Sequence, residues 1–390
     1  MIYLDHAAAT PLDRQVLEAM EPYYVDDFFN PSAAYLPAKK VAAEYEKAKG
    51  VIAHAIGAKA SDLVITAGAT EANNLAFTAI TLADCDSRKE GTRPHQNRVL
   101  YLETEHDSVR RVAEAYSGEA VRVQPNGVVD LKDLKQKITD ETEMVSVALV
   151  NNELGTIQPL AEIGALIREK RIDRLRRGVT TQLLLHSDAS QALSLLDINV
   201  ARLGVDLLTL NAAKVYGPKG VGALYVSHEA RLKPLTYGGG QENGLRSGTE
   251  NVPGVIGFAK AVELAREHLN GNRKKYTKWR DRLLDELDGY ELINKKRVLS
   301  NFVVISYPGL DAERLVFALE EKGVLVATGA ACAASKGVRS HVLSAIGLPE
   351  EMIAGSLRIT LGETNDEEQI TEAARIINDV VKKERERVEQ

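Results

Sequence analysis

Residues 211–220 read Asn211-Ala212-Ala213-Lys214-Val215-Tyr216-Gly217-Pro218-Lys219-Gly220 and lie between two apolar runs, Asp206–Leu210 and Val221–Val226. The runs have the length of buried strands, and the short turn between them makes the strands neighbours in one sheet. An amine beside apolar walls loses hydration as an ammonium, so we expect Lys214 to shift toward the neutral, nucleophilic form. This is the state in which a lysine forms a Schiff base.

An acid ends another apolar run upstream of this turn, in Leu183-Leu184-Leu185-His186-Ser187-Asp188. Pyridoxal phosphate enzymes pair a Schiff-base lysine with an aspartate at the pyridinium nitrogen, so Lys214 and Asp188 together predict this cofactor. Gln191 lies three residues beyond Asp188, close to one helical turn, so both side chains are expected at one site. Taken singly, a surface turn lysine and a helix N-cap aspartate remain alternatives.

Apolar runs alternate with amphipathic stretches between residues 62 and 226, which is typical of a mainly parallel sheet wrapped by helices in an α/β protein. The predicted strands are Leu63–Thr66, Val99–Glu103, Val145–Val150, Gln182–Ser187, Leu207–Asn211 and Ala223–Val226. Ligands bind such sheets where the strands end. A Gly-rich segment, Gly238–Thr249, precedes a long helical pattern, Val252–Leu287, which is expected to lead into a second domain.

The composition is compatible with a globular enzyme and excludes few classes of protein. With 390 residues the chain exceeds what one core usually fills, so two domains are expected. A formal net charge of -6 gives no broad electrostatic reason to bind nucleic acid or an anionic membrane surface. No run of about 18 apolar residues occurs and the N-terminus lacks signal-peptide features, so we expect a cytoplasmic protein. No metal site is predicted, and Cys85 and Cys332 lie in such different surroundings that a disulfide is not expected.

Three further stretches could contact a cofactor. Thr66-Ala67-Gly68-Ala69-Thr70 follows a strand and opens a helix, so its backbone N–H groups and the Thr70 hydroxyl form an anion site. His106 stands just past a strand, where an imidazole could stack on a flat ring or move protons. Asn152 follows a buried strand and could donate to a phenolic oxygen or a carboxylate. Helix capping, a solvated loop histidine and turn formation are the competing interpretations.

The second reactive element is Cys332, in Gly329-Ala330-Ala331-Cys332-Ala333-Ala334-Ser335. Small neighbours on both sides predict a loop that leaves the sulfur uncovered, which suits a thiol that must reach a substrate. Further on, Arg358 lies inside an alternating strand, Ser356–Leu361. An inward arginine needs an acidic partner, and either a substrate carboxylate or a structural salt bridge provides one.

These residues carry a resemblance: nearly the whole chain resembles a cysteine desulfurase of the fold-type I pyridoxal phosphate group. The order and spacing of the motifs make the resemblance specific. The matching motifs are Tyr3-Leu4-Asp5, Ala8-Ala9-Thr10-Pro11, Gly68-Ala69-Thr70-Glu71, Thr104-Glu105-His106, Val150-Asn151-Asn152-Glu153, Asp188-Ala189-Ser190-Gln191, Lys214–Gly220, Gly238–Thr249, Cys332 and Arg358. The spacing between Cys332 and residues 342–347 resembles the long form of the family's cysteine loop, which passes its sulfur to partner proteins.

The resemblance implies an architecture and a set of cofactor contacts. It implies a fold-type I transferase with a large domain, residues 13–255, built on a mainly parallel seven-stranded sheet. Residues 1–12 and 256–390 would form a smaller α/β domain that carries Cys332, and the chain would be a homodimer. The cofactor contacts would be Lys214 as Schiff base, Asp188 at the pyridine nitrogen, His106 stacked on the ring, Gln191 and Asn152 beside it, and Ala69, Thr70, Asn211 and the second protomer's Thr249 at the phosphate.

The resemblance also implies the reaction. Arg358 and Asn152 would hold the carboxylate of L-cysteine, with Lys214, His106 and Cys332 as the catalytic residues. The Cys332 thiolate would attack the substrate sulfur, leaving a persulfide on Cys332 and releasing L-alanine. The sulfur would pass to an acceptor protein, such as an iron–sulfur scaffold or a tRNA thiolation carrier.

The chain departs from the family pattern at two places. Asn211-Ala212-Ala213 stands where the family usually has Ser-Gly-His, and Tyr35 and Ala38 replace a usual His and Gly. Losing a charge-assisted donor to the phosphate is expected to cost roughly 1.5 to 3 kcal/mol, or about ten- to a hundredfold in cofactor affinity.

Two other readings stay open. Another fold-type I enzyme, such as an aminotransferase or a selenocysteine lyase, would use Lys214 and Asp188 without needing Cys332. A homologue without turnover would act as a docking partner.

Overall fold

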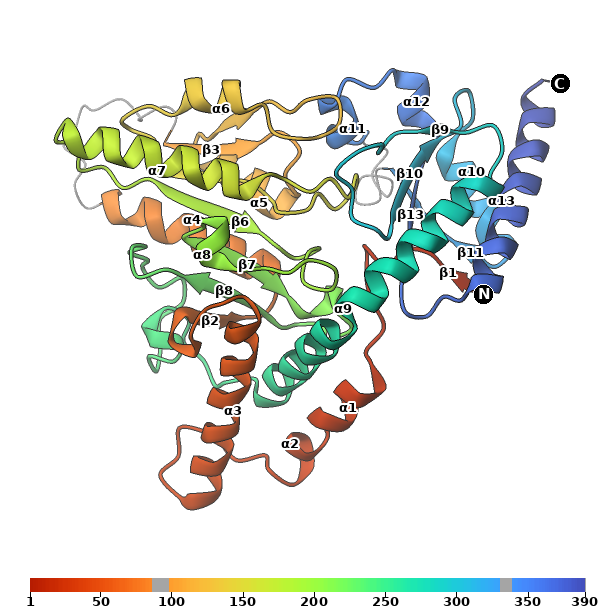
Figure 1. The fold of residues 1–390 in the computed structure, drawn as a ribbon. Coiled ribbons are helices and arrows are strands. Elements are labelled where there is room, and N and C mark those ends of the chain that lie inside the picture. The colour runs from red at the N-terminus through yellow and green to blue at the C-terminus, as the bar shows by residue number, and fades with distance from the viewer. Residues whose placement is uncertain (86–97, 330–338, 390) are drawn as a thin grey trace.

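The computed structural model describes residues 1–85, 98–329 and 339–389. Within them the larger of the sheets has seven strands, in the order β2-β8-β7-β6-β5-β3-β4 (Figure 1). Its strands are β2 (Leu63–Thr66), β3 (Val99–Leu102), β4 (Glu119–Val121), β5 (Met144–Ser146), β6 (Leu184–Asp188), β7 (Leu207–Asn211) and β8 (Gly222–Val226). β8 runs antiparallel to both β2 and β7, and the other neighbouring strands are parallel. The α/β class and the mainly parallel seven-stranded sheet are therefore confirmed.

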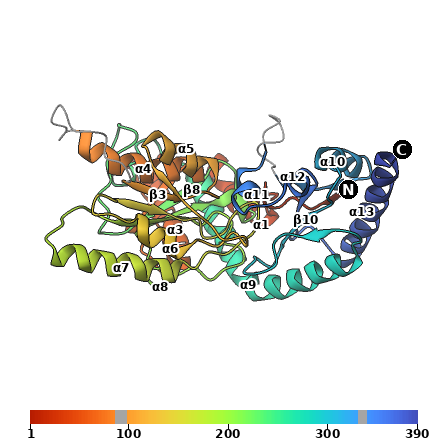
Figure 2. The same ribbon diagram turned by 90° about the horizontal axis from the view of Figure 1, so that it is seen from above.

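Helices cover both faces of this sheet, with α4 and α5 on one face and α7 and α8 on the other (Figure 2). The α-helices that precede residue 204 in the chain are α1 (Arg14–Met20), α2 (Pro22–Val25), α3 (Leu36–Ala55), α4 (Ala69–Cys85), α5 (Asp107–Ala115), α6 (Leu131–Lys137), α7 (Leu160–Arg176) and α8 (Val200–Leu203). Because both faces are covered, every residue of β2, β3, β5 and β6 is buried. This explains why β2 and β3 read as nearly continuous apolar runs in the sequence.

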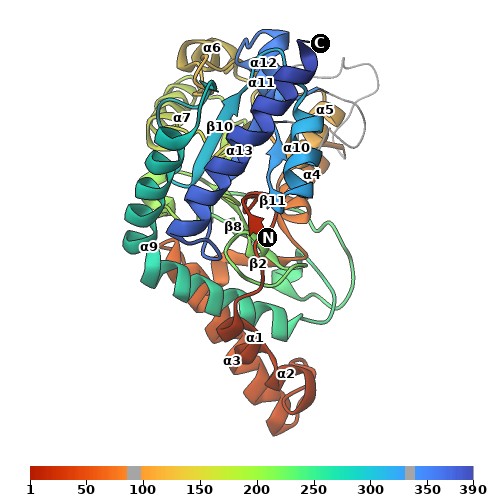
Figure 3. The same ribbon diagram turned by 90° about the vertical axis from the view of Figure 1, so that its right-hand side faces the viewer.

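A second group of elements lies beside the first, and the long helix α9 (Val252–Glu286) runs from one to the other (Figure 1). This second group contains a four-stranded sheet, ordered β12-β13-β10-β9, and a two-stranded pair, β1-β11. Its elements are β1 (Ile2–Tyr3), β9 (Glu291–Leu292), β10 (Phe302–Ser306), α10 (Ala312–Glu321), β11 (Val324–Leu325), β12 (Ala327–Thr328), α11 (His341–Ala345), α12 (Glu350–Ala354), β13 (Ser356–Thr360) and α13 (Glu367–Val388). The N-terminus therefore lies beside β11, more than three hundred residues along the chain (Figure 3).

Three short 3₁₀ helices complete the described elements: η1 (Ala60–Asp62), η2 (Ala212–Lys214) and η3 (Glu242–Gly244). Of these, η2 forms the turn between β7 and β8, which pair directly, as the sequence predicts for the Lys214 turn. No helix of the described residues combines the length and apolarity needed to cross a membrane.

The predicted and observed strands differ in two respects. The short strand β4 is not predicted, because two of its three residues are only half-buried and carry no apolar run. The predicted strand Val145–Val150 is assigned only as far as Ser146, although the N–H groups of Val147 and Leu149 still donate to β6 at 3.0 and 2.8 Å. The division of the chain near residues 12 and 255 stays a prediction.

Candidate active site

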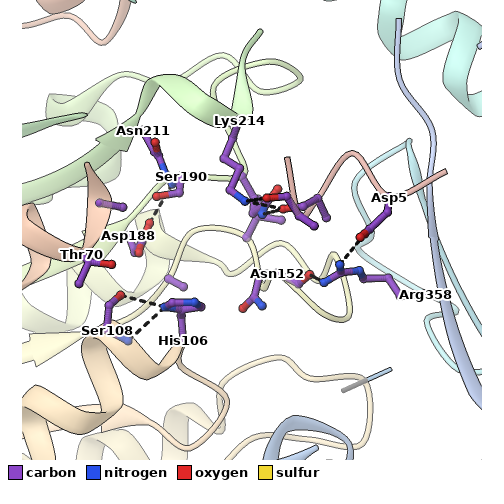
Figure 4. A pocket seen from close by; sticks show the side chains of 16 residues that line it. Asp5, Thr70, His106, Ser108, Asn152, Asp188, Ser190, Asn211, Lys214 and Arg358 are labelled. Carbon is purple, nitrogen blue, oxygen red and sulfur yellow. Dashed lines mark hydrogen bonds and ion pairs between the residues drawn. The ribbon is translucent and has the colours of Figure 1, made fainter. Parts of the chain in front are cut away.

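A cavity of about 400 Å³ opens where the carboxyl ends of the sheet strands face the N-terminal segment and β13 (Figure 4). Polar groups from seven different parts of the chain converge on it. Nine of the predicted site residues line it: Ala69, Thr70, His106, Asn152, Asp188, Gln191, Asn211, Lys214 and Arg358. Thr249 is exposed and is not among the lining residues. Cys332 lies outside the described residues.

Lys214 ends η2 and extends its side chain toward the N-terminal segment (Figure 4). Its Nζ donates to the carbonyl oxygen of Ala7 at 2.8 Å and to that of Ala8. The amide of Gln191 donates to the same Ala7 oxygen at 2.9 Å. The N-terminal segment is thus part of the lysine's surroundings, which the local sequence around Lys214 does not reveal.

Asp188 is the last residue of β6, and its carboxylate is buried with a donor on each oxygen. Oδ1 accepts from the backbone N–H of Ser190 at 2.9 Å, and Oδ2 accepts from the Asn73 amide at 2.8 Å. The same Asn73 amide nitrogen lies 2.8 Å from the Ser108 hydroxyl. Donors to a carboxylate favour its charged form.

Asn73 was assigned no role from the sequence. It is fully buried on α4, three residues beyond Thr70, so both side chains project from the same side of the helix. The three-residue spacing from Thr70 in the predicted anion site is the sequence signal that points to Asn73.

His106 is the N-cap of α5 and lines the cavity opposite Lys214 (Figure 4). The backbone N–H of Ser108 donates to His106 Nδ1 at 3.1 Å, so this nitrogen carries no proton in the observed arrangement. The proton of the neutral ring is therefore on Nε2. That nitrogen is the one able to exchange a proton with a molecule in the cavity.

The start of α4 has the chemistry that suits an anion. Ala69 and Thr70 form its first turn and line the cavity, so unpaired N–H groups and the positive end of the helix dipole lie at this end. Asn211 lies nearby, and its Oδ1 accepts from the N–H of Ala213 at 3.1 Å. The amide nitrogen is therefore the end of Asn211 that can donate to a bound anion.

Arg358 reaches the cavity from β13 and is almost completely buried. Its Nη2 pairs with Asp5 Oδ1 at 2.6 Å, and its Nη1 donates to the carbonyl oxygen of Asn152 at 2.9 Å. Its Nε is buried with no hydrogen-bond partner among the described residues. The structural salt bridge considered from the sequence is thus present, with Asp5 as the acid.

Three buried ionisable groups lie within two residues of the cavity lining in the sequence. Burial raises the pKa of the Glu105 carboxyl well above its usual value, against the effect of the Ala148 N–H, which donates to it at 2.6 Å. Burial raises the pKa of Glu153 to about 7, although the hydroxyl of Ser340 donates to it at 2.5 Å. Burial lowers the pKa of His186, in β6 beneath the cavity, to about 4, so this imidazole is neutral near pH 7.

Residues 2–372 match the family model described as aminotransferase class-V. The chain belongs to the class-V aminotransferase family. The cysteine desulfurase IscS of Clostridium botulinum (strain Hall) is 36% identical over 99% of this chain and 95% of its own length. The cysteine desulfurase IscS 1 of Archaeoglobus fulgidus is 35% identical over 98% of this chain and 97% of its own.

A solved structure of a NifS-like protein superposes with a TM-score of 0.88 at 30% identity, covering 98% of this chain and 99% of the other. Class-V aminotransferases and cysteine desulfurases are pyridoxal phosphate enzymes. The fold-type I class and the resemblance to cysteine desulfurases are therefore confirmed.

Proposed function

We propose that this chain, a class-V enzyme of the cysteine desulfurase group, converts L-cysteine to L-alanine and carries the removed sulfur as a persulfide on Cys332. The single observation that carries the proposal is the convergence of Lys214, Asp188, His106 and Arg358 on one cavity. These residues come from separate parts of the sequence. Lys214, Asp188 and His106 have the chemistry needed to hold and tune the cofactor, and Arg358 has the chemistry needed to hold a substrate carboxylate.

The residues fit pyridoxal phosphate. The cavity volume of about 400 Å³ lies within the range of small-molecule sites, about 300 to 1,000 Å³. A carboxylate that already has two donors, Asp188, is a good acceptor for a protonated ring nitrogen, and the start of α4 suits a phosphate. Lys214 would hold the cofactor, with Asn211 and Gln191 beside it. When bound, this cofactor supplies an electron sink for charge that develops at the substrate's α-carbon.

Two nitrogen bases, His106 and Lys214, line the cavity, and their surroundings support different roles for them. Because His106 Nδ1 accepts from the Ser108 N–H, the neutral ring would present Nε2–H and act as a donor that can orient or protonate. Lys214, once its amine is neutral, is the group able to accept a proton from the α-carbon. Arg358 and Asn152 would hold the substrate carboxylate, and Arg358 would then share its guanidinium between that carboxylate and Asp5.

The sulfur step belongs to Cys332. Its thiolate would attack the substrate sulfur, the carbon–sulfur bond would break, and the electron pair would return to the carbon that becomes the methyl group of alanine. The product on the protein is a persulfide, which a second protein's thiol can accept. SspA, whose structure in complex with cysteine superposes with a TM-score of 0.80 at 32% identity over 93% of this chain and 99% of its own, supports L-cysteine as the substrate.

We further propose a cytoplasmic homodimer in which Thr249 of one protomer reaches the phosphate site of the other. The exposure of Thr249 outside the cavity of its own chain supports this arrangement. The sulfur acceptor would be an iron–sulfur scaffold or a thiolation carrier.

The test is alanine and sulfide release from L-cysteine by purified protein supplied with pyridoxal phosphate, with Cys332→Ala and Lys214→Ala assayed beside it. We expect alanine from the wild type and none from either variant. If Cys332→Ala still makes alanine at the wild-type rate, the sulfur leaves without Cys332, as it would in a selenocysteine lyase. An aminotransferase would instead convert L-cysteine to its 2-oxo acid and make no alanine. If the wild type binds the cofactor but makes no alanine, the desulfurase proposal is wrong.

A further inference from the structure

The backbone of the turn that carries Lys214 is strained at Tyr216, two residues after the lysine. Tyr216 has a φ of 62°, in the left-handed region that non-glycine residues rarely adopt, and it is half-buried. Such a conformation persists only where the surroundings hold it. The contacts that hold this turn therefore also determine where the lysine side chain begins.

Thr10 provides three of these contacts. Its Oγ1 accepts from the backbone N–H of Tyr216 at 2.8 Å and donates to the carbonyl oxygen of Ala213 at 3.1 Å. Its own backbone N–H lies 3.3 Å from the same Ala213 oxygen. One residue thus bonds to the turn on both sides of Lys214, and its 4% exposed fraction keeps water from replacing it.

Other residues of the N-terminal segment also contact the turn that carries Lys214. The N–H of Asp13 donates to the carbonyl oxygen of Tyr216 at 3.0 Å. The carbonyl oxygens of Ala7 and Ala8 accept from Lys214 Nζ, so the segment holds both the base and the tip of the lysine.

We infer that Thr10 is a positioning residue: its hydroxyl clamps the strained turn and thereby sets the direction in which Lys214 enters the cavity. The inference rests on the proposed role of Lys214 as the Schiff-base residue. Without the hydroxyl, the N–H of Tyr216 loses its partner in a partly buried setting, and the turn is expected to relax toward a less strained conformation.

The test compares Thr10→Val, which keeps the shape and removes the hydroxyl, with Thr10→Ser, which keeps the hydroxyl. Cofactor-free proteins are mixed with pyridoxal phosphate, and capture by Lys214 is followed by absorbance, then by borohydride reduction and mass spectrometry of the lysine peptide. We expect capture by Thr10→Val to be about tenfold weaker than by wild type, and Thr10→Ser to stay within about threefold of it. In turnover we expect Thr10→Val to lower kcat and leave the KM for L-cysteine within about twofold, because Arg358 and Asn152 are unchanged.

Thr142→Val is the matched control. Thr142 is fully buried and its hydroxyl accepts from the N–H of Thr139 at 3.0 Å, but it does not line the cavity. We expect it to lower the thermal stability without weakening capture.

The inference is overturned if Thr10→Val captures the cofactor as well as wild type, or if Thr142→Val weakens capture equally. It is also overturned if Thr10→Val does not fold, because the hydroxyl would then serve the folding of the whole chain. A wild-type protein whose Lys214 captures no cofactor would instead contradict the proposed function, whatever the variants do.

Discussion

The two walls of the cavity are built in different ways. The sheet wall consists of Ala69, Thr70, His106, Asp188, Asn211 and Lys214, at strand ends and helix starts of the large sheet. The strap wall consists of Asp5, Ala7 and Ala8 from the N-terminal segment and Arg358 from β13. Apart from Lys214, whose turn is also held by Thr10, the groups of the sheet wall take their orientation from the strand or helix that carries them. In the strap wall, Asp5 and Arg358 pair with each other across 353 positions of sequence.

This difference has a chemical consequence. In the sheet wall, Asp188 is supported from behind by Asn73 and Ser190, so its carboxylate is held ready for a ligand. In the strap wall, Arg358 already has an acidic partner, so a substrate carboxylate must share or replace that partner. We therefore expect substitutions in the sheet wall to act mainly on kcat, and those in the strap wall to act mainly on KM.

The largest effect is expected at Asp188. Asp188→Asn keeps the shape but removes the negative charge that would hold a proton on the cofactor's ring nitrogen, so kcat should fall about a hundredfold or more. Steady-state kinetics with saturating cofactor measures this. Asp133→Asn, at a buried acid that pairs with Arg122 and Lys137, is the control and should leave kcat unchanged. Equal losses from both variants would contradict a special role for the sheet wall.

Glu153, which interacts electrostatically with Arg358 of the strap wall, is expected to make stability depend on pH. Its pKa of about 7 in the folded chain lies above its ordinary value of 4.5, so the folded state binds the proton more tightly. The stabilisation is complete below about pH 4.5 and is lost as the pH rises through about 7, a change of roughly 3 kcal/mol at most. Denaturant unfolding from pH 4 to pH 8 should show this loss in the wild type and a flatter profile in Glu153→Gln. Parallel profiles for the two proteins would show that Glu153 does not titrate in this range.

Arg358→Lys tests the strap wall itself. A lysine keeps the charge but cannot bond Asp5, Asn152 and a substrate carboxylate with one planar group, so the KM for L-cysteine should rise about tenfold. We expect kcat to change less than KM. If kcat falls about a hundredfold while KM is unchanged, the assignment of binding to this wall is wrong.

The smallest effect is expected at the phosphate end of the sheet wall. Ala213 is half-buried beside Asn211, and Ala213→His restores the donor that the family usually has there. Cofactor affinity, measured by titrating cofactor-free protein, should increase about tenfold, because the added imidazole supplies a donor to the phosphate. Ala213→Leu adds bulk without a donor and should not tighten binding. Equal tightening by both would mean that packing, and not hydrogen bonding, is responsible.

The sequence predicts the sheet wall far better than the strap wall. Lys214, Asp188 and His106 each stand at the end of an apolar run, so their position at the strand ends follows from local pattern. The pairing of Asp5 with Arg358 and the contacts of Thr10 with residues 213 and 216 join distant segments, and no local pattern encodes them.

The apolar runs predict six of the seven strands of the large sheet, and they miss β4 because it is only half-buried. Buried polar residues that hydrogen-bond to a site residue are equally hard to predict. Asn73 reads as an ordinary helix residue until the fold places it against Asp188.

The central claim is that Cys332 carries the sulfur removed from L-cysteine. The most direct measurement is mass spectrometry of the Cys332 peptide after cofactor-loaded protein has reacted with L-cysteine in the absence of reductant, with alanine quantified in the same sample. We predict that the peptide becomes heavier by one sulfur atom, in proportion to the alanine formed, and that Lys214→Ala shows neither product. Alanine formed without any sulfur on Cys332 would contradict the account.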